Sequence, residues 1–291
     1  MGVLAVMVLV AFADPGDGLA KAMLPIYAKE AEAYSFAVAS APGQPLELRK
    51  EPIFEWLNAV RQDTQGTLFV WLRDGRPSAL ACIFSYPHDK LAGREVVHEL
   101  HALDREKLIV TRAAFNQWKP QAGLDRKELP DAPAPAATAG GRLVQMRRLA
   151  QEFTGHSTDW DGKRWELRLL PTPLFRYPTA KAGVVDGALF ALMSGGGTDP
   201  EVLILLEARE DKGGLLWEYA CGRFSDWELS VSRKEKRVYE SVRGENNPGH
   251  HDPLHLYRLY PEKVFDKGHK LLAQVRQRPN GSTDLILAED K

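Results

Sequence analysis

The sequence has little of several features that often reveal a function. Only two of its 291 residues are cysteines, and 38 Lys and Arg residues against 39 Asp and Glu residues leave a formal net charge of −1. A near-neutral chain lacks the basic surplus of a dedicated nucleic-acid-binding protein. Beyond the N-terminus, no apolar run is long enough for a transmembrane helix. A serine-hydrolase elbow, a Cys-x-x-Cys pair and a dinucleotide-binding glycine fingerprint are also absent, so no motif indicates an enzyme class.

The N-terminus differs from the rest of the chain. Residues 3–12 are almost entirely apolar, and residues 11–13 read Ala-Phe-Ala, the small-x-small form of an export cleavage site. This run is too short to span a bilayer and fits the core of a signal peptide. No Lys or Arg precedes it, and a buried N-terminal strand or helix is the alternative. We predict that residues 1–13 are a signal peptide and that the protein is exported to the periplasm, the cell surface or the medium.

The chain repeats itself. Leu-Glu-Leu-Arg at 46–49 returns 119 residues later as Trp-Glu-Leu-Arg, and Gly-Thr-Leu-Phe-Val-Trp at 66–71 returns 121 residues later as Gly-Ala-Leu-Phe-Ala-Leu. A fixed internal period of this kind indicates a tandem duplication. The boundaries that we predict are a first repeat at 14–128, a Pro/Ala-rich linker at 129–141, a second repeat at 142–232 and a non-repeated C-terminal extension at 233–291.

Each repeat is predicted to be a helix followed by an antiparallel β-meander, an α+β fold. Amphipathic or Ala-rich patterns predict helices at 19–39 and 142–153. The period then changes to that of strands, and short turn signals such as Asp74-Gly75 connect them. The predicted strands are 45–50, 66–72, 78–85, 95–103 and 107–112 in the first repeat, and 164–170, 187–193, 201–208, 216–224 and 227–232 in the second.

Two of the predicted strands are apolar on both faces. Residues 68–72 and 202–206 are continuously apolar, and such strands need cover on both faces. We therefore expect the two repeats to pack on one another with pseudo-twofold symmetry. In the extension, we expect a short helix at 253–265 and a hairpin of residues 271–275 and 285–287.

The two cysteines, Cys82 and Cys221, fall on apolar strand positions that are not equivalent in the two repeats. Buried thiols are the ordinary interpretation of such positions. Two cysteines also fit an exported protein, so a disulfide between them is the alternative.

The segment His98-Glu99-Leu100-His101 resembles a zinc-protease motif but is one residue short. We expect it in a strand, where residues three apart point to opposite faces and do not share one ion. His98 is then a semi-buried histidine with satisfied hydrogen bonds. Glu99 and His101 share the other face and form a possible polar pair.

A second histidine cluster is the strongest chemical signal in the chain. Its members are His250, His251, Asp252 and His255. Imidazole and carboxylate groups at this density can hold a transition metal. The alternative is a polar loop leading into a helix, with Asp252 as the N-cap and Pro253 at the first helical position.

The sequence favours a non-catalytic exported protein that binds a partner protein or small ligand in the groove between repeats or on the concave sheet faces. No polar cluster is present in both copies, no cofactor is expected, and nucleic acid is not an expected partner. One alternative is a metal-binding protein or metal-assisted hydrolase, centred on the His250–His255 cluster and using a divalent ion. Another is a carrier that encloses a small apolar molecule between helix and sheet.

Overall fold

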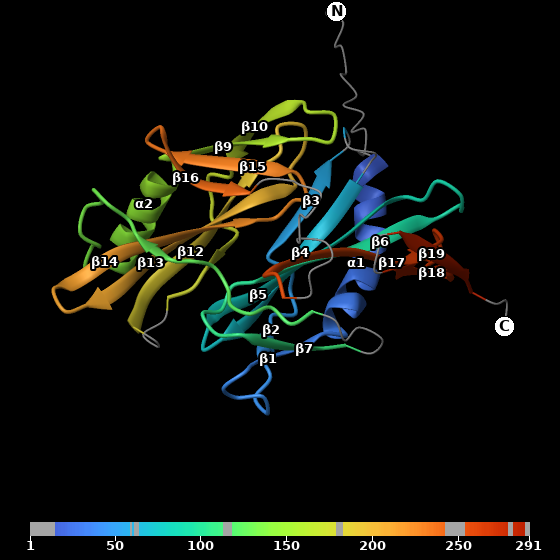
Figure 1. Cartoon of the computed structure of the whole chain (residues 1–291), viewed down its shortest axis with the longest axis horizontal. Coiled ribbons are helices and arrows are strands. Elements are labelled where there is room, and N and C mark those ends of the chain that lie inside the picture. Colours follow the sequence, from blue (N-terminus) through green and yellow to red (C-terminus); the bar gives the residue numbers. More distant parts are fainter. Residues whose placement is uncertain are drawn as a thin grey trace, which may run out of the picture.

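The computed structural model describes residues 15–58, 60, 64–112, 118–178, 183–241, 254–278 and 282–288. These residues form mostly antiparallel β-sheet, with two helices at opposite sides (Figure 1). The helices are α1 (Pro15–Glu32) and α2 (Ala139–Ala150). The predicted antiparallel strands are confirmed, whereas the helical share is smaller than an α+β class implies, so the fold is best described as β-rich.

The first sheet has eight strands, in the order β19-β18-β17-β6-β5-β4-β2, with β3 also paired to β4. Strands β1 and β7 form a separate two-stranded ribbon. The bounds are β1 (Ser35–Val38), β2 (Glu47–Leu48), β3 (Phe54–Asn58), β4 (Thr64–Arg73), β5 (Arg76–Pro87), β6 (Arg94–Ala102), β7 (Leu108–Thr111), β17 (Tyr257–Phe265), β18 (Leu271–Gln277) and β19 (Thr283–Leu287).

The second sheet has nine strands, in the order β16-β15-β9-β10-β12-β13-β14-β8, with β11 also paired to β12. The bounds are β8 (Lys127–Glu128), β9 (Phe153–Thr158), β10 (Arg164–Leu169), β11 (Phe175–Arg176), β12 (Val184–Met193), β13 (Pro200–Asp211), β14 (Gly214–Arg223), β15 (Glu228–Arg233) and β16 (Lys236–Ser241).

Three apolar cores separate the molecule into four layers. One lies between α1 and the first sheet, one between the two sheets, and one between the second sheet and α2. The middle core joins Leu68 and Val70 of β4 to Leu203 and Leu205 of β13. Since neighbouring residues of a strand point to opposite faces, Phe69 faces α1 instead. The expectation that these apolar strands are covered on both faces is confirmed.

A buried ion pair also links the sheets. Arg76 of β5 donates to both carboxylate oxygens of Glu207 on β13, at 2.6 Å each. Arg126 and the Tyr177 hydroxyl also donate to Glu207, at 3.2 and 2.9 Å. This bidentate pair fixes how one sheet lies on the other.

Some predicted elements are wrong in type or extent. The helix predicted at 19–39 ends at Glu32, because Ser35–Val38 pairs with β7 instead. The helix predicted at 253–265 is wrong, since Tyr257–Phe265 is a strand that pairs along β6 and passes Pro261 at an irregularity in register. The predicted C-terminal hairpin is confirmed as β18 and β19.

Local turn chemistry is as the sequence indicates. Asp74 and Gly75 join β4 to β5 with φ of 54° and 82°, the left-handed region that Asp tolerates and Gly adopts freely. Residues 1–13, the predicted signal peptide, lie outside the described part. Neither helix of the described part has both the length and the apolar character needed to cross a membrane.

Candidate functional site

Strand β6 carries the sequence-predicted residues His98, Glu99 and His101. Because side chains alternate along a strand, neighbouring residues of β6 serve two different regions. His98 faces the layer of α1, where its ring lies against that of Tyr34. Glu99 faces the second sheet and shares a pocket wall with Phe224.

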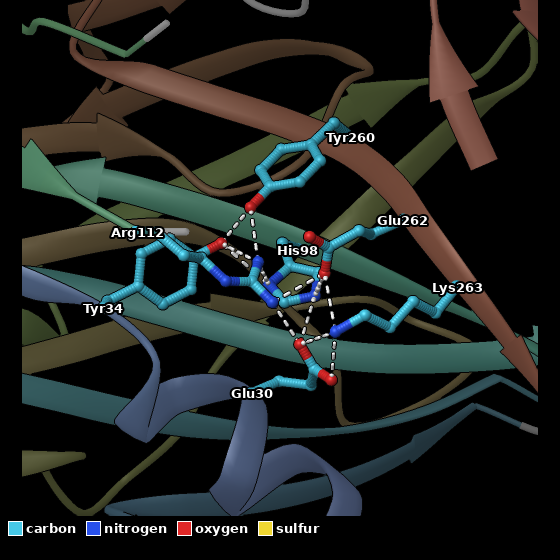
Figure 2. A network of polar contacts seen from close by, with 7 residues as sticks. All are labelled: Glu30, Tyr34, His98, Arg112, Tyr260, Glu262 and Lys263. Atoms are coloured by element: carbon cyan, nitrogen blue, oxygen red, sulfur yellow. Dashed lines mark hydrogen bonds and ion pairs between the residues drawn. The ribbon is translucent and has the colours of Figure 1, made fainter. Parts of the chain in front are cut away.

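On the α1 side, His98 belongs to a cluster of polar side chains that we term the polar network (Figure 2). Helix α1 supplies one member, β6 another, and β17 and the segments next to β1 and β7 the rest. Five of the members are buried: Glu30, Tyr34, His98, Arg112 and Tyr260. The full set is Glu30, Tyr34, His98, Arg112, Tyr260, Glu262 and Lys263.

Arg112 lies at the centre of the polar network (Figure 2). Its guanidinium donates to the hydroxyls of Tyr34 and Tyr260 at 3.0 Å each, and to Oε2 of Glu262 at 2.6 Å. It also donates to Oε2 of Glu30. Hydrogen bonds between ionised groups are the strong ones in proteins, so Arg112 ties α1 firmly to β17.

The charges of the polar network balance. Lys263 donates to both oxygens of Glu30, at 2.7 and 2.9 Å, so two cations face Glu30 and Glu262. Burial lowers the pKa of His98 and keeps its imidazole neutral at pH 7. Burial alone would raise the pKa of Glu262, but its contacts with His98, Arg112 and Lys263 outweigh that effect and lower the pKa to about 2. The cluster is therefore electrically satisfied.

Three members of the polar network have the donor atoms of a metal site. One ligand atom from each of Glu30, His98 and Glu262 lies within 4.8 Å of the others, and imidazole with carboxylates suits zinc. However, Arg112 already donates to the same Oε2 atoms of both glutamates. A divalent ion would have to displace this guanidinium and lie close to Lys263. The arrangement therefore fits a structural brace better than a metal centre.

On the other face of β6, where the two sheets meet, lies a cavity of about 150 Å³ that we term the inter-sheet pocket. Its wall comes from both halves of the chain and from β17, and it combines aromatic rings with carboxyl groups. The lining residues are Trp56, Thr64, Cys82, Phe84, Glu99, Asp199, Pro200, Phe224, Ser225, Asp226, Trp227 and Leu259.

The glycine-rich segment 194–198 helps to build this pocket. It is a hairpin loop between β12 and β13, as its sequence position suggests, and it packs against β3 of the other half. The Asn58 side-chain amide donates to Oδ1 of Asp199 at 2.8 Å. A Cβ atom on Gly197 would lie 2.5 Å from Cγ of Asn58, so this close approach requires glycine. The contact holds Asp199 in the pocket wall.

Glu99 is the buried carboxyl group of the pocket. Its Oε1 accepts a hydrogen bond from the Tyr257 hydroxyl at 2.7 Å. Burial raises the pKa of Glu99, the carboxylates of Asp226 and Asp199 raise it further, and the Tyr257 hydrogen bond and Arg223 lower it, which leaves a pKa of about 8. Glu99 is therefore mostly protonated at pH 7.

The cysteines lie on different faces of the structure and are both free thiols. Cys82 lines the pocket, where its Sγ accepts a hydrogen bond from the Trp56 indole N–H at 3.1 Å. Burial and the neighbouring Glu99 raise the pKa of the Cys82 thiol well above its usual value. Cys221 packs against the core beneath α2. The buried-thiol interpretation is confirmed for Cys82, whereas Cys221 is half-buried, and the disulfide is not formed.

The other sequence-predicted site residues have separate partners. His98 is fully buried rather than semi-buried. His101 is also buried, with Nδ1 2.9 Å from the carbonyl oxygen of Ala102, whereas Glu99 binds Tyr257. His255 is half-buried, and its Nδ1 accepts the backbone N–H of Tyr257 at 3.2 Å. The remaining members of that cluster, His250, His251 and Asp252, lie outside the described residues.

Several members of the two sites were missed from the sequence. Arg112 and Glu262 are joined by a hydrogen bond but lie 150 residues apart in the sequence, and Asn58 and Asp199 are likewise 141 residues apart. Pairs this distant leave no local spacing pattern. Of the residues that line the pocket, the sequence analysis had singled out Glu99, in a possible polar pair, and Cys82.

Comparison with known proteins adds no functional information. No protein-family model, curated protein or solved structure matches this chain. Its function therefore has to be inferred from the polar network and the inter-sheet pocket.

Proposed function

We propose that the chain is an exported, non-catalytic binding protein made of two tandem α+β repeats, and that its ligand occupies the inter-sheet pocket. The observation that carries this proposal is the origin of the pocket wall. Trp56 and Glu99 come from one half, Asp199 and Trp227 from the other, and Leu259 from the extension. Binding pockets occur preferentially between such units and mix apolar surface with a few polar groups.

Recurring strand pairings support the duplication. In the first half β1 pairs with β7 and β4 lies between β2, β3 and β5; in the second half β9 pairs with β15 and β12 lies between β10, β11 and β13. One packing detail also recurs. A Cβ atom on Gly66 would clash with the ring of Trp56, and one on Gly187 would clash with the ring of Tyr177. Both glycines and both aromatic residues are 121 positions apart.

The chemistry of the pocket favours binding over catalysis. A carboxyl group with a pKa of about 8, such as Glu99, is also suited to general acid–base work. A nucleophile would need a base or a lowered pKa, yet burial raises the pKa of the Cys82 thiol, and the Trp56 N–H that its sulfur accepts does not offset this. Among the described lining residues, no histidine or lysine is present to activate it.

Native mass spectrometry of the protein from its source organism tests the proposal. We expect the wild type to retain an organic mass that denaturation releases. A Thr64→Trp variant, which fills the pocket from the start of β4, should lose that mass while keeping its fold. Retention of the same mass by the folded variant would contradict binding in the pocket. Sequencing of the mature N-terminus tests export separately, with Asp14 expected as the first residue.

Metal binding is the second candidate, on the strength of the Glu30, His98 and Glu262 donor atoms. Metal content is to be measured in the wild type, in His98→Gln, and in a His250→Ala/His251→Ala/His255→Ala variant. Loss of metal in only one variant would locate the site. Near-zero metal in all three proteins would remove this candidate. An apolar carrier is favoured less, because carboxyl groups in the pocket wall disfavour a purely apolar ligand.

A further inference from the structure

The inter-sheet pocket has an acidic wall. Glu99, Asp199 and Asp226 contribute carboxyl groups, and none of the described lining residues is Lys, Arg or His. Arg223 acts on Glu99 from behind the wall, where it donates to the backbone oxygens of Ser225 and Trp227 and lies over the Tyr257 ring. Glu99 is mostly protonated at pH 7, but a cation inside the cavity would face the carboxyl oxygens of all three residues and would favour the ionised form of Glu99.

Aromatic rings make up much of the remaining wall. Trp56 and Phe84 lie together, with ring centroids 5.8 Å apart, and Trp227 and Phe224 come from the second half. The faces of aromatic rings attract cations, and tryptophan does so most strongly. Rings and carboxyl groups together form the kind of site that recognises ammonium groups.

The volume of the cavity suits a small ligand. At about 150 Å³, it matches a cavity that holds one benzene molecule. A bare metal ion suits it less well, because hard cations need several oxygen ligands and rings form much of this wall. A small organic cation can contact the rings with its alkyl groups and the carboxylates with its charge.

We propose that the inter-sheet pocket binds a small organic cation of the alkylammonium class, held between Trp56 and Trp227 and paired with the carboxylates of Glu99 and Asp226. This inference rests on the proposed function and specifies its ligand class. Binding of the cation should change the protonation state of Glu99. The groups that face Glu99 are Tyr257, Asp226, Asp199, Arg223 and Cys82, and an added cation favours its ionised form. Binding should therefore release a proton near neutral pH.

Two probes of the same shape, one cationic and one neutral, test the ligand class. tert-Butylammonium and the neutral tert-butanol are titrated into the full protein, while NMR follows the indole N–H signals of Trp56 and Trp227. We expect the ammonium ion to shift both signals with saturation, and the alcohol to bind at least about tenfold more weakly, which corresponds to about 1.4 kcal/mol. Glu99→Gln and Asp226→Asn should each weaken the ammonium by about tenfold, whereas the exposed control Asp211→Asn should not.

The outcomes distinguish a failure of the proposed ligand class from a failure of the proposed binding function. If tert-butanol binds as tightly as the ammonium and shifts the same indoles, the cation class is overturned while the pocket stands as a binding site. If neither probe shifts either indole, the cation class is overturned, and the retained mass in native mass spectrometry then decides the proposed function by itself. A pH series adds a signature: ammonium affinity should fall from pH 8 to pH 6 in the wild type and stay level in Glu99→Gln.

Discussion

His98 and Glu99 are adjacent in the sequence and lie on opposite faces of β6, in two polar sites with different electrostatics. In the polar network, Arg112 and Lys263 face the carboxylates of Glu30 and Glu262 at hydrogen-bonding distance. In the inter-sheet pocket, carboxyl groups and aromatic rings line an open space of about 150 Å³. The first site pairs its cations with its carboxylates, whereas the second presents three carboxyl groups, and no Lys, Arg or His among its described lining residues, to a cavity.

The difference distinguishes polar groups that hold the fold together from polar groups that line a cavity. Buried ionic groups whose partners are all present contribute mainly structure and specificity, and breaking them is costly. Polar groups that face a cavity, with pKa values shifted by burial and like charges, are candidates for recognition or chemistry. Substitutions on the two faces of β6 test this distinction.

Removing the centre of the polar network should have the largest effect. Arg112→Met leaves the buried Glu30 and the half-buried Glu262 with Lys263 as their remaining cation, and breaking a buried pair in this way costs about 3–5 kcal/mol of unfolding free energy. Urea denaturation measures the change. Arg278→Met, in the exposed pair with Asp284, is the control and should change stability little. A loss for Arg112→Met below about 1 kcal/mol would contradict the role of the network as a brace.

Replacing Glu99 with glutamine should change how stability depends on pH. Burial raises the folded-state pKa from 4.5 to about 8, so the stability that protonation provides is complete below the unfolded pKa and is lost as pH rises toward 8. Glu99→Gln lacks this titration. Relative to the variant, the wild type should lose about 2 kcal/mol between pH 4 and pH 6, at about 1.36 kcal/mol per pH unit. Parallel stability curves for the two proteins would contradict the raised pKa.

Two tyrosines on β17 allow a matched test. The Tyr260 hydroxyl shares a hydrogen bond with the Tyr34 hydroxyl in the polar network, and the Tyr257 hydroxyl donates to Glu99 in the pocket wall. Tyr260→Phe and Tyr257→Phe should each cost about 1 kcal/mol, because each removes a buried hydrogen-bonding hydroxyl. Only Tyr257→Phe should raise the pKa of Glu99 further and alter ammonium binding. Equal effects of both variants on the pH profile would show that the two sites are not independent.

The smallest effect is expected at the thiols. Both cysteines are free, and the pKa values of Cys82 and Cys221 are raised by burial. Iodoacetamide at pH 8 should therefore leave both unmodified in the folded protein, and both should react after unfolding without reductant. Rapid alkylation of Cys82 in the native state would show that the pocket activates its thiol, which would favour an enzyme.

Local patterns predicted much of the fold. The Asp74-Gly75 turn and the apolar strands on either side required no tertiary information. Pro253 misled the prediction, because it suggested a helix start, while the pairing of Tyr257–Phe265 with β6 imposed a strand. The repeat alignment was also shifted locally: Leu48 pairs with Trp71 and Leu169 pairs with Leu192, a spacing of 121 rather than the 119 suggested by the matching letters.

The sites were less predictable than the fold. Strand alternation was enough to separate His98 from Glu99 and His101. It did not reveal that Arg112 and Glu262 would enclose His98, or that Asp226 would lie near Glu99, because those contacts depend on how β17 and the second sheet pack. Tertiary packing, rather than local spacing, decides which of these charges are compensated.

Crystallography of the protein purified from its source organism would test the central claim most directly, because it views both faces of β6 at once. We predict electron density for a small organic cation in the inter-sheet pocket, between Trp56 and Trp227 and against Glu99, with Arg112 still bonded to Glu30 and Glu262. Density for an ion among Glu30, His98 and Glu262, with Arg112 displaced and the pocket closed by side chains, would contradict the account.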